Sequence, residues 1–101
     1  MKSGYNILWT DYALAELKTT IEYLETHWTE KEIKNLVSKI ENILEFISKN
    51  PELFPQTQSR KNVRRAVVSK QNTIYYRTKG QNVEILSFFS TKQNPKKKKF
   101  L

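Results

Sequence analysis

The sequence predicts a single α+β domain with the element order strand, helix, helix, strand, strand, strand, in which an antiparallel sheet carries a helical hairpin on one face. Three observations predict this fold. In the first half, apolar residues recur every three or four positions over two consecutive segments, which is the period of a helix. In the second half, residues that favour strands fall into three short runs. The link between the two helical segments and the links between the last three strands are short, so these neighbours are expected to pack against each other.

The first predicted elements are a strand from Tyr5 to Thr10 and a helix that ends near His27. The strand segment, YNILWT, is rich in aromatic and branched residues. Thr10 or Asp11 can cap the helix, because either side chain accepts hydrogen bonds from unpaired backbone N–H groups. The spacing of apolar residues predicts the buried face of this helix, which consists of Leu14, Leu17, Ile21 and Leu24.

The second helix is predicted to start at Thr29 and to end near Asn50. Thr29 and Glu32 have the spacing of a capping box. Pro51 ends the helix, because the residue before a proline avoids helical geometry. The apolar face of this helix consists of Ile33, Leu36, Val37, Ile40, Ile43, Leu44 and Ile47. Two such helices joined by a short link form an antiparallel hairpin.

Three strands are predicted to follow a polar connector. They cover Val63 to about Lys70, Thr73 to Lys79, and Val83 to about Thr91. Because the links between them are short, they are expected to form an antiparallel meander. The first strand must then join the same sheet, and the helix pair must cover one of its faces.

Side-chain alternation assigns the residues of these strands to the two faces of the sheet. One face is expected to carry Ile74 and Tyr76 and, on the last strand, Val83, Ile85 and Phe89. The opposite face is expected to carry Thr73, Tyr75 and Arg77. Arg64 and Arg65 are adjacent and must point to opposite faces, and the sequence does not decide which arginine lies on which face.

The net charge of +8 is distributed unevenly. Residues 1–52 carry six basic and nine acidic residues, whereas residues 53–101 carry twelve basic residues and a single acidic one, Glu84. A one-sided field attracts polyanions or acidic proteins. The same charges would also serve solubility alone, so the charge by itself leaves both interpretations open.

Composition excludes several classes of site. The chain has no cysteine, which excludes disulfides, thiolate metal sites and a cysteine nucleophile. Its single histidine, His27, argues against a histidine-rich metal site. No run approaches the roughly 20 apolar residues of a membrane span, and the N-terminus lacks the pattern of a signal peptide. We therefore expect a cytoplasmic protein without cofactor, metal or membrane partner.

Four segments carry a family resemblance when they are taken in order: YNILWTDYALAELKTTIEYL, NPELFP, VRRAVVSKQNTIYYRT and VEILSFFSTKQNP. They span Tyr5 to Pro95 and together resemble the RelE/ParE superfamily of bacterial toxins from type II toxin–antitoxin systems. The stretch from Lys92 to Pro95 is similar to a family signature in which arginine often precedes Gln-x-Pro. The resemblance implies a growth-inhibiting toxin that is neutralised by a cognate antitoxin.

The superfamily divides by target. RelE-like members cut messenger RNA on the ribosome, whereas ParE-like members poison DNA gyrase and are not nucleases. In the RelE-like pattern, Arg64 matches the first basic position and Lys92 remains basic. Ala66, Thr73 and Gln93 stand where basic residues are expected, and the late tyrosine or histidine has no counterpart beyond Lys92. The resemblance therefore favours the ParE-like kind, with a ribosome-dependent endoribonuclease or a non-toxic nucleic-acid-binding module as alternatives.

Cleaving RNA through its 2′-hydroxyl needs a proton acceptor, a proton donor and charge stabilisation. Arginine and lysine supply the third, and His27 is expected to be an ordinary helix-end residue. The candidates for a catalytic role are Arg64, Arg77 and Lys92. The residues predicted to bind the target are Arg64, Arg65, Tyr75, Arg77, Lys92 and Gln93. Of these, Arg64, Tyr75 and Arg77 could form a face that stacks bases and binds phosphates, or they could be cross-strand filler.

We assign residues 1–95 to one toxin-like domain and residues 96–101 to a basic C-terminal tail. Lys92 to Pro95 is interpreted as a functional strand end. Lys96 to Lys99 is interpreted as electrostatic attraction without a fixed geometry. The partner implied by the resemblance is an acidic antitoxin segment that lies over the helices or adds a strand at a sheet edge. The implied target is DNA gyrase or, for the alternative, the ribosome with its messenger RNA.

Overall fold

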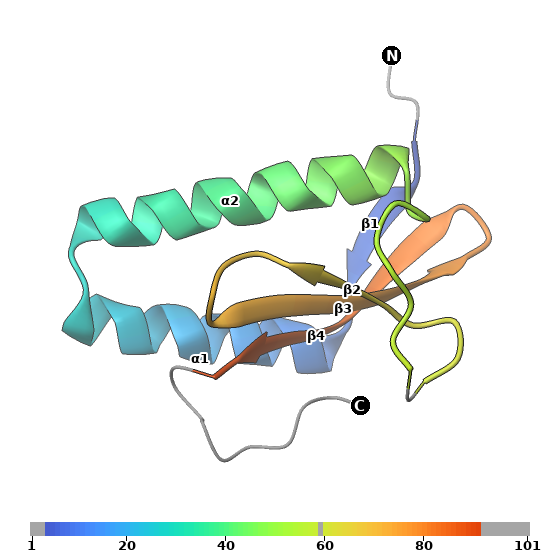
Figure 1. The fold of residues 1–101 in the computed structure, drawn as a ribbon. Coiled ribbons are helices and arrows are strands. Elements are labelled where there is room, and N and C mark those ends of the chain that lie inside the picture. Colours follow the sequence, from blue (N-terminus) through green and yellow to red (C-terminus); the bar gives the residue numbers. More distant parts are fainter. Residues whose placement is uncertain (1–3, 59, 92–101) are drawn as a thin grey trace.

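The structure, a computed structural model, describes residues 4–58 and 60–91 (Figure 1). Its elements are β1 (Asn6–Trp9), α1 (Asp11–His27), α2 (Glu30–Lys49), β2 (Arg64–Val67), β3 (Asn72–Lys79) and β4 (Asn82–Ser90). The predicted α+β fold and element order are confirmed: a four-stranded sheet carries a helical hairpin. The first strand of the meander is shorter than predicted: it was expected from Val63 to about Lys70, and β2 covers four residues.

Local side-chain bonds start both helices where they were predicted to start. The hydroxyl oxygen of Thr10 accepts a hydrogen bond from the N–H of Ala13 at 3.2 Å. At the start of α2, the hydroxyl oxygen of Thr29 accepts from the N–H of Glu32 at 3.2 Å, and the Glu32 carboxylate accepts from the N–H of Thr29 at 3.0 Å. The capping box is therefore complete. The helix ends at Lys49, as the following Asn-Pro pair requires.

The buried face of α1 differs from the predicted one. Leu14 is 47% exposed, and the residues of α1 that are buried are Ala13, Thr20 and Leu24. Ala13, Thr20 and Leu24 lie on one face of the helix. Leu14 follows Ala13 directly and is rotated from it by about 100° around the helix axis, so it lies to one side of this face. The prediction was wrong at Leu14 because it counted only large apolar residues and left out Ala13 and Thr20. Val37 of α2, also placed on the apolar face, is likewise exposed.

The strands are ordered β1-β4-β3-β2 in the sheet. The pairs β2–β3 and β3–β4 are antiparallel, as predicted for the meander. β1 departs from the expected antiparallel arrangement, because it pairs with β4 in parallel. Tight turns force neighbouring strands to run antiparallel, but β1 and β4 are joined through both helices and two strands, so no tight turn sets their relative direction.

A β-bulge between β3 and β4 changes which residues face the helices. On β3, Tyr75 lies opposite Ser87 of β4, and the next residue, Tyr76, lies opposite Ile85. Leu86 of β4 therefore has no partner on β3 and is the extra residue of the bulge. Beyond a bulge, the alternation of the strand is inverted. Phe88 therefore joins the main core beneath the helices, and Phe89 packs on the opposite face. The predicted placement of Phe89 was wrong because alternation assumes an uninterrupted strand.

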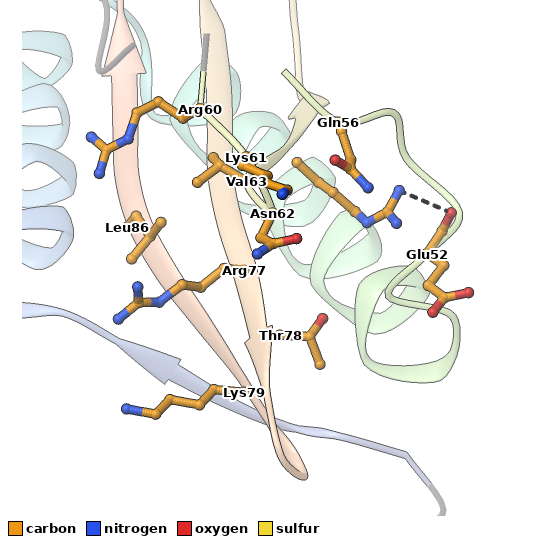
Figure 2. A pocket seen from close by; sticks show the side chains of 11 residues that line it. Glu52, Gln56, Arg60, Lys61, Asn62, Val63, Arg77, Thr78, Lys79 and Leu86 are labelled. Carbon is orange, nitrogen blue, oxygen red and sulfur yellow. Dashed lines mark hydrogen bonds between the residues drawn. The ribbon is translucent and has the colours of Figure 1, made fainter. Parts of the chain in front are cut away.

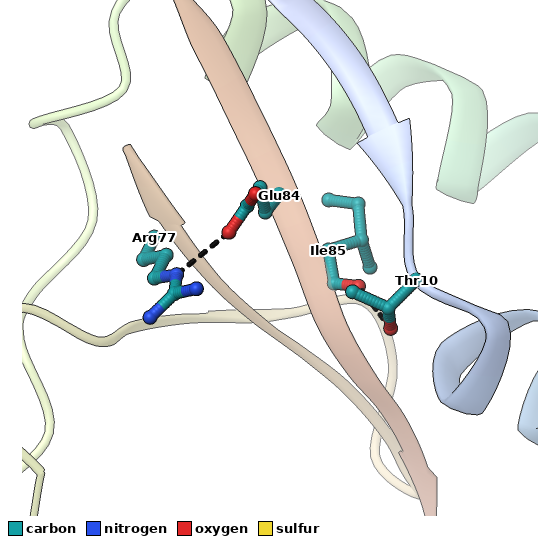
Figure 3. A network of polar contacts seen from close by, with 4 residues as sticks. All are labelled: Thr10, Arg77, Glu84 and Ile85. Carbon is teal, nitrogen blue, oxygen red and sulfur yellow. Dashed lines mark hydrogen bonds and ion pairs between the residues drawn. The ribbon is translucent and has the colours of Figure 1, made fainter. Parts of the chain in front are cut away.

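The main core lies between the helical hairpin and one face of the sheet. Its buried residues are Ala13, Leu24, Leu36, Ile40, Ile47, Ala66, Val68, Ile74, Tyr76, Val83, Ile85 and Phe88. Where β1 ends, the chain turns into α1 beside β4, and the Thr10 hydroxyl donates a hydrogen bond to the carbonyl oxygen of Ile85 at 2.9 Å (Figure 3). The start of α1 is thereby fixed against the sheet.

The carboxylate of Glu16 in α1 accepts hydrogen bonds from β4. The donors belong to the part of β4 that follows the residues paired with β1. Its Oε1 accepts hydrogen bonds from the backbone N–H of Phe88 at 2.9 Å and from the Ser87 hydroxyl at 2.6 Å. Ser87 is fully buried. Both donors would lose their acceptor without this side chain, and buried donors that lack a partner are costly.

Replacing Glu16 by alanine is expected to lower the free energy of unfolding by about 2 kcal/mol, because it leaves the Phe88 and Ser87 donors unpaired. Urea denaturation followed by circular dichroism measures the change. Glu22→Ala is the matched control, since Glu22 is exposed on the same helix and should change stability by less than about 0.5 kcal/mol. Equal effects of the two substitutions would show that the Glu16 bonds do not stabilise the fold.

Candidate functional site

Arg64 and Tyr76 hold the connector between α2 and β2. They lie opposite each other on β2 and β3, so their side chains share one face of the sheet. Nη1 of Arg64 donates to the carbonyl oxygen of Phe54 at 2.7 Å, and the Tyr76 hydroxyl donates to the carbonyl oxygen of Pro51 at 2.7 Å. Because Tyr76 belongs to the main core, this is the face that the helices cover. Arg64 therefore has a structural role whatever else it binds.

The opposite face of the sheet carries the other residues predicted for this region. Arg65 lies opposite Tyr75, and Arg77 lies on the same face as Tyr75 because the two are separated by one residue of β3. The structure thus decides which arginine is on which face: Arg65 shares the face of Tyr75 and Arg77, and Arg64 does not. The predicted grouping of Arg64 with Tyr75 and Arg77 on one face is not found.

Tyr75 lies beneath this surface and is only 1% exposed. It packs with Val63 and Phe89 in a second, smaller apolar cluster. Burial raises the pKa of the Tyr75 hydroxyl, and the nearby charge of Arg65 and a hydrogen bond with it oppose the rise. The ring therefore supports the surface from below and does not present its face to a base.

Arg77 is held by an ion pair with the residue directly opposite it. Its Nε donates to Oε1 of Glu84 at 2.7 Å (Figure 3). The side chains of Arg77 and Glu84 are 48% and 24% exposed, so water screens the pair in part. The ion pair orients the guanidinium on the surface and offsets part of its charge.

A groove of about 770 Å³ is lined by residues from both faces of the sheet: Arg77 and Lys79 lie on the face of Tyr75, whereas Arg64 and Thr78 lie on the other face. Its lining contains five basic residues and one acidic residue, Glu52. The basic residues are Arg60, Lys61, Arg64, Arg77 and Lys79. Figure 2 shows the side chains of Arg60, Arg77 and Lys79 pointing to one side of the sheet, with Leu86 between Arg60 and Arg77, whereas Thr78 points to the other side. The groove therefore collects positive charge from a loop and from the end of β3.

The loop before β2 brings Arg60 and Lys61 to the groove. The backbone N–H of Thr57 donates to the carbonyl oxygen of Val63 at 2.7 Å, which closes the loop. Inside it, the Thr57 hydroxyl accepts from the N–H of Arg60 at 3.2 Å and donates to its carbonyl oxygen at 3.0 Å. Asn62 has a φ of 67°, in the left-handed region that asparagine tolerates better than most residues. These bonds close the loop and fix the backbone of Arg60 within it.

Lys92 and Gln93 lie outside the residues that the structure describes, as do the rest of the predicted strand end to Pro95 and the predicted basic tail of residues 96–101. β4 ends at Ser90, and the N–H of Thr91 donates to the carbonyl oxygen of Gln71 at 2.9 Å. The roles of Lys92 and Gln93 in binding therefore stay predictions.

His27 ends α1. Figure 1 shows that the turn between α1 and α2 lies on the opposite side of the molecule from the loop that precedes β2. Its ring stacks on Tyr23 with a centroid distance of 4.2 Å. Its Nδ1 lies 2.9 Å from the carbonyl oxygen of Tyr23 and 2.6 Å from the Thr26 hydroxyl. These local contacts are those of a helix-end residue, as predicted.

Other kinds of site find no support in the described ranges, residues 4–58 and 60–91. These residues contain no group of three or more histidine, cysteine, aspartate or glutamate side chains that could hold a metal ion. They also contain no helix that is both long and apolar enough to span a membrane. The groove is the candidate site because its lining brings together Arg60, Lys61, Arg64, Arg77 and Lys79.

A family model described as the ParE toxin of the type II toxin–antitoxin system, parDE, matches residues 7–95. The chain belongs to this family of ParE toxins. The match covers all six elements except the first residue of β1. The predicted membership of the RelE/ParE superfamily is thereby confirmed. A comparison with curated proteins gave no match.

Solved structures with the ParE-family fold are similar to this chain at low sequence identity. The chromosomal ParDE TA system from P. aeruginosa has a TM-score of 0.72 and 16% identity, and the similarity covers 85% of this chain and 95% of that one. The YoeB/ParE toxin from Agrobacterium tumefaciens has a TM-score of 0.63 and 15% identity, with 84% and 96% covered. The E. coli DinJ-YafQ toxin-antitoxin complex has a TM-score of 0.62 and 13% identity, with 91% and 98% covered. At these identities the likeness concerns the fold.

Sequence reasoning about this ParE-family chain missed three residues of the groove: Arg60, Lys61 and Lys79. Arg60 and Lys61 belong to a segment that was interpreted as a polar connector, and Lys79 was interpreted as the end of a strand. The charge imbalance between the two halves of the chain includes all three. The imbalance indicated that the second half of the chain carries a basic surface. It contains no information on which basic residues come together in the folded structure.

The pH dependence of stability should reveal the buried Tyr76 hydroxyl. Burial raises its pKa to about 12, although the charge of Arg64 opposes the rise. The pKa of a tyrosine in the unfolded chain is about 10, so the folded state holds this proton more tightly than the unfolded state does. The resulting stabilisation is complete below pH 10 and is lost as the pH rises through about 12. We expect the wild-type chain to lose about 2 to 3 kcal/mol more than Tyr76→Phe over this window. Urea titrations at pH 9 and at pH 12 measure it, and parallel losses in both chains would contradict it.

Proposed function

We propose that this chain is the growth-inhibiting toxin of a toxin–antitoxin pair and that it acts by binding DNA gyrase without cleaving nucleic acid. The observation that carries the proposal is the match of residues 7–95 to the family of ParE toxins. Gyrase as the target comes from the resemblance to ParE-like toxins. The basic face with Arg65 and Arg77, the adjoining groove, and Lys92 and Gln93 are the proposed contacts with the target.

The chemistry of the groove supports binding over cleavage. Attack by a 2′-hydroxyl needs a group that accepts its proton and a group that protonates the leaving oxygen. Among the residues that the structure describes, the groove lining offers basic side chains and the carboxylate of Glu52, and it includes no imidazole. Tyr75 and Tyr76 are both buried and have raised hydroxyl pKa values, so neither is suited to accept a proton near neutral pH. The arrangement can attract and orient an anionic surface.

A cognate antitoxin is the proposed partner. Similar folds occur in solved toxin–antitoxin complexes, among them DinJ-YafQ from E. coli and YoeB-YefM from Staphylococcus aureus. The basic groove would attract an acidic segment of such a protein, since charge complementarity speeds association and selects the partner. We propose that this antitoxin is acidic and that both proteins are cytoplasmic.

Gyrase inhibition tests the proposal directly. The purified chain should inhibit the supercoiling of relaxed plasmid by gyrase, and adding the product of a short adjacent acidic reading frame should restore the activity. In cells, induction of the gene alone should stop growth while messages remain intact by primer extension. Codon-phased cuts in ribosome-bound messages would instead indicate an endoribonuclease. Healthy growth with folded protein present would remove the toxin function.

A further inference from the structure

The groove beside β3 has a lining that resembles a surface for phosphate groups. Besides its five basic residues, it contains the hydrogen-bonding side chains of Gln56 and Asn62, and that of Thr78, which points to the other side of the sheet from Arg77 and Lys79. Arginine, lysine, asparagine, glutamine and threonine are the side chains that contact the phosphate and sugar oxygens of nucleic acids. With Glu52 as the only acidic residue, the lining carries four more positive than negative charges.

The composition of the lining also distinguishes between kinds of polyanion. A single strand binds best where exposed aromatic rings stack on its bases, and none of the lining residues within 4–58 and 60–91 is aromatic. Tyr75, the aromatic residue predicted for this face, is buried. A protein segment usually anchors apolar or aromatic side chains in the centre of its interface. The apolar residues here are Val63, which is buried, and Leu86, which is half-buried.

The basic residues divide into fixed and adaptable ones. Arg64 is fixed by its bond to the Phe54 carbonyl, and Arg77 by its bond to Glu84. Arginines that are already oriented lose less conformational freedom when a ligand binds. Lys61 and Lys79 are exposed, and their ammonium groups can follow phosphates at varied positions. Such a combination suits a regular backbone of phosphates and does not require a particular base sequence.

We propose that the groove binds the phosphate backbone of duplex DNA without reading its sequence. The inference deepens the proposed function and rests on it in one respect, because DNA is the substrate of the proposed target. The toxin would then contact the DNA that gyrase holds as well as the enzyme. Free duplex DNA would bind weakly and with a strong dependence on salt, since each phosphate contact releases counterions.

Fluorescence anisotropy with a labelled 20-base-pair duplex of mixed sequence tests the inference without gyrase. All chains carry Lys96 to Lys99 replaced by glutamine, so that the tail does not contribute. The double variant Lys61→Gln with Lys79→Gln should weaken binding about tenfold and reduce the slope of log affinity against log salt by about 2. The matched control is Lys18→Gln with Lys34→Gln, which removes the same charge from exposed positions on the helices. The control should retain the slope of the parent chain.

A variant with the opposite expected effect keeps the test independent of folding. Glu52→Gln removes the only acidic side chain of the groove, while the backbone of residue 52 is unchanged. It should raise the affinity for the duplex about two- to threefold. Equal losses in the groove and control variants, or no gain with Glu52→Gln, would overturn the inference. If a single strand of the same sequence binds more tightly than the duplex, the ligand of the groove is RNA or unpaired DNA. If a polyglutamate peptide displaces the labelled duplex at a lower concentration than unlabelled duplex does, the ligand is an acidic protein segment.

Failure of this inference can be told apart from failure of the proposed function. If the chain inhibits gyrase but the groove variants bind duplex DNA like the control, the groove does not bind DNA and the toxin function stands. If the groove variants lose duplex binding but the wild-type chain has no effect on gyrase or on growth, the DNA site stands and the toxin function does not.

Discussion

Replacing Arg77 by glutamine should reduce growth inhibition and raise the concentration needed to inhibit gyrase by about tenfold. On the face of the sheet that carries Arg65 and Arg77, the 2.7 Å bond from Nε of Arg77 to Glu84 holds the Arg77 guanidinium in place. A hydrogen bond to a charged group contributes about 1.5 to 3 kcal/mol, and 1.4 kcal/mol corresponds to a tenfold change in affinity. Losing a preoriented cation should therefore weaken binding to an anionic target by at least this factor.

Glu84→Gln is the matched control for Arg77→Gln. Both substitutions break the same ion pair and leave an amide in its place, but only Arg77→Gln removes the cation. Glu84→Gln removes the nearest opposing charge and should keep or increase the inhibition. Growth after induction and supercoiling by purified gyrase are the two measurements. If both variants are impaired to the same degree, the ion pair shapes the sheet and Arg77 does not contact the target.

Replacing Tyr76 by alanine should lower the free energy of unfolding by about 4 kcal/mol, which is the expected cost of removing a large buried aromatic side chain. Tyr76 is 0% exposed in the main core, and its hydroxyl holds the carbonyl of Pro51 in the connector. A domain of this size has a total stability of roughly 5 to 15 kcal/mol. The alanine variant should therefore lose a large share of its stability, so it should unfold at a much lower urea concentration and accumulate less folded toxin in cells.

Tyr76→Phe separates the two contributions of this side chain. It keeps the ring in the core and removes only the bond to Pro51, so it should cost about 1 kcal/mol and keep toxicity. Urea denaturation at neutral pH measures both variants. An alanine variant with the stability of the phenylalanine variant would mean that the core repacks around the missing ring, which would contradict the central position assigned to Tyr76.

The properties that the sequence by itself determined are local ones. The start of each helix depends on a hydrogen bond between a threonine side chain and the backbone three residues later, at Thr10 for α1 and at Thr29 for α2. The spacing of Thr29 and Glu32 in the sequence is enough to predict the second of these bonds. The end of α2 depends on the residue next to it, Pro51. The number and order of elements follow from periodicities within single segments. The charge imbalance follows from composition, and the order of motifs was enough to identify the family.

The tertiary structure alone decided which of these residues meet. The direction of β1, the inversion of β4 after Leu86 and the burial of Tyr75 all depend on partners that are distant in the sequence. The meeting of Arg60 and Lys61 with Arg77 and Lys79 depends on a loop that closes through backbone bonds. Contacts within a turn or a helix are set by residues a few positions apart, so a pattern reveals them. Strand register and loop closure are set by hydrogen bonds and packing over the whole chain, and no local pattern encodes them.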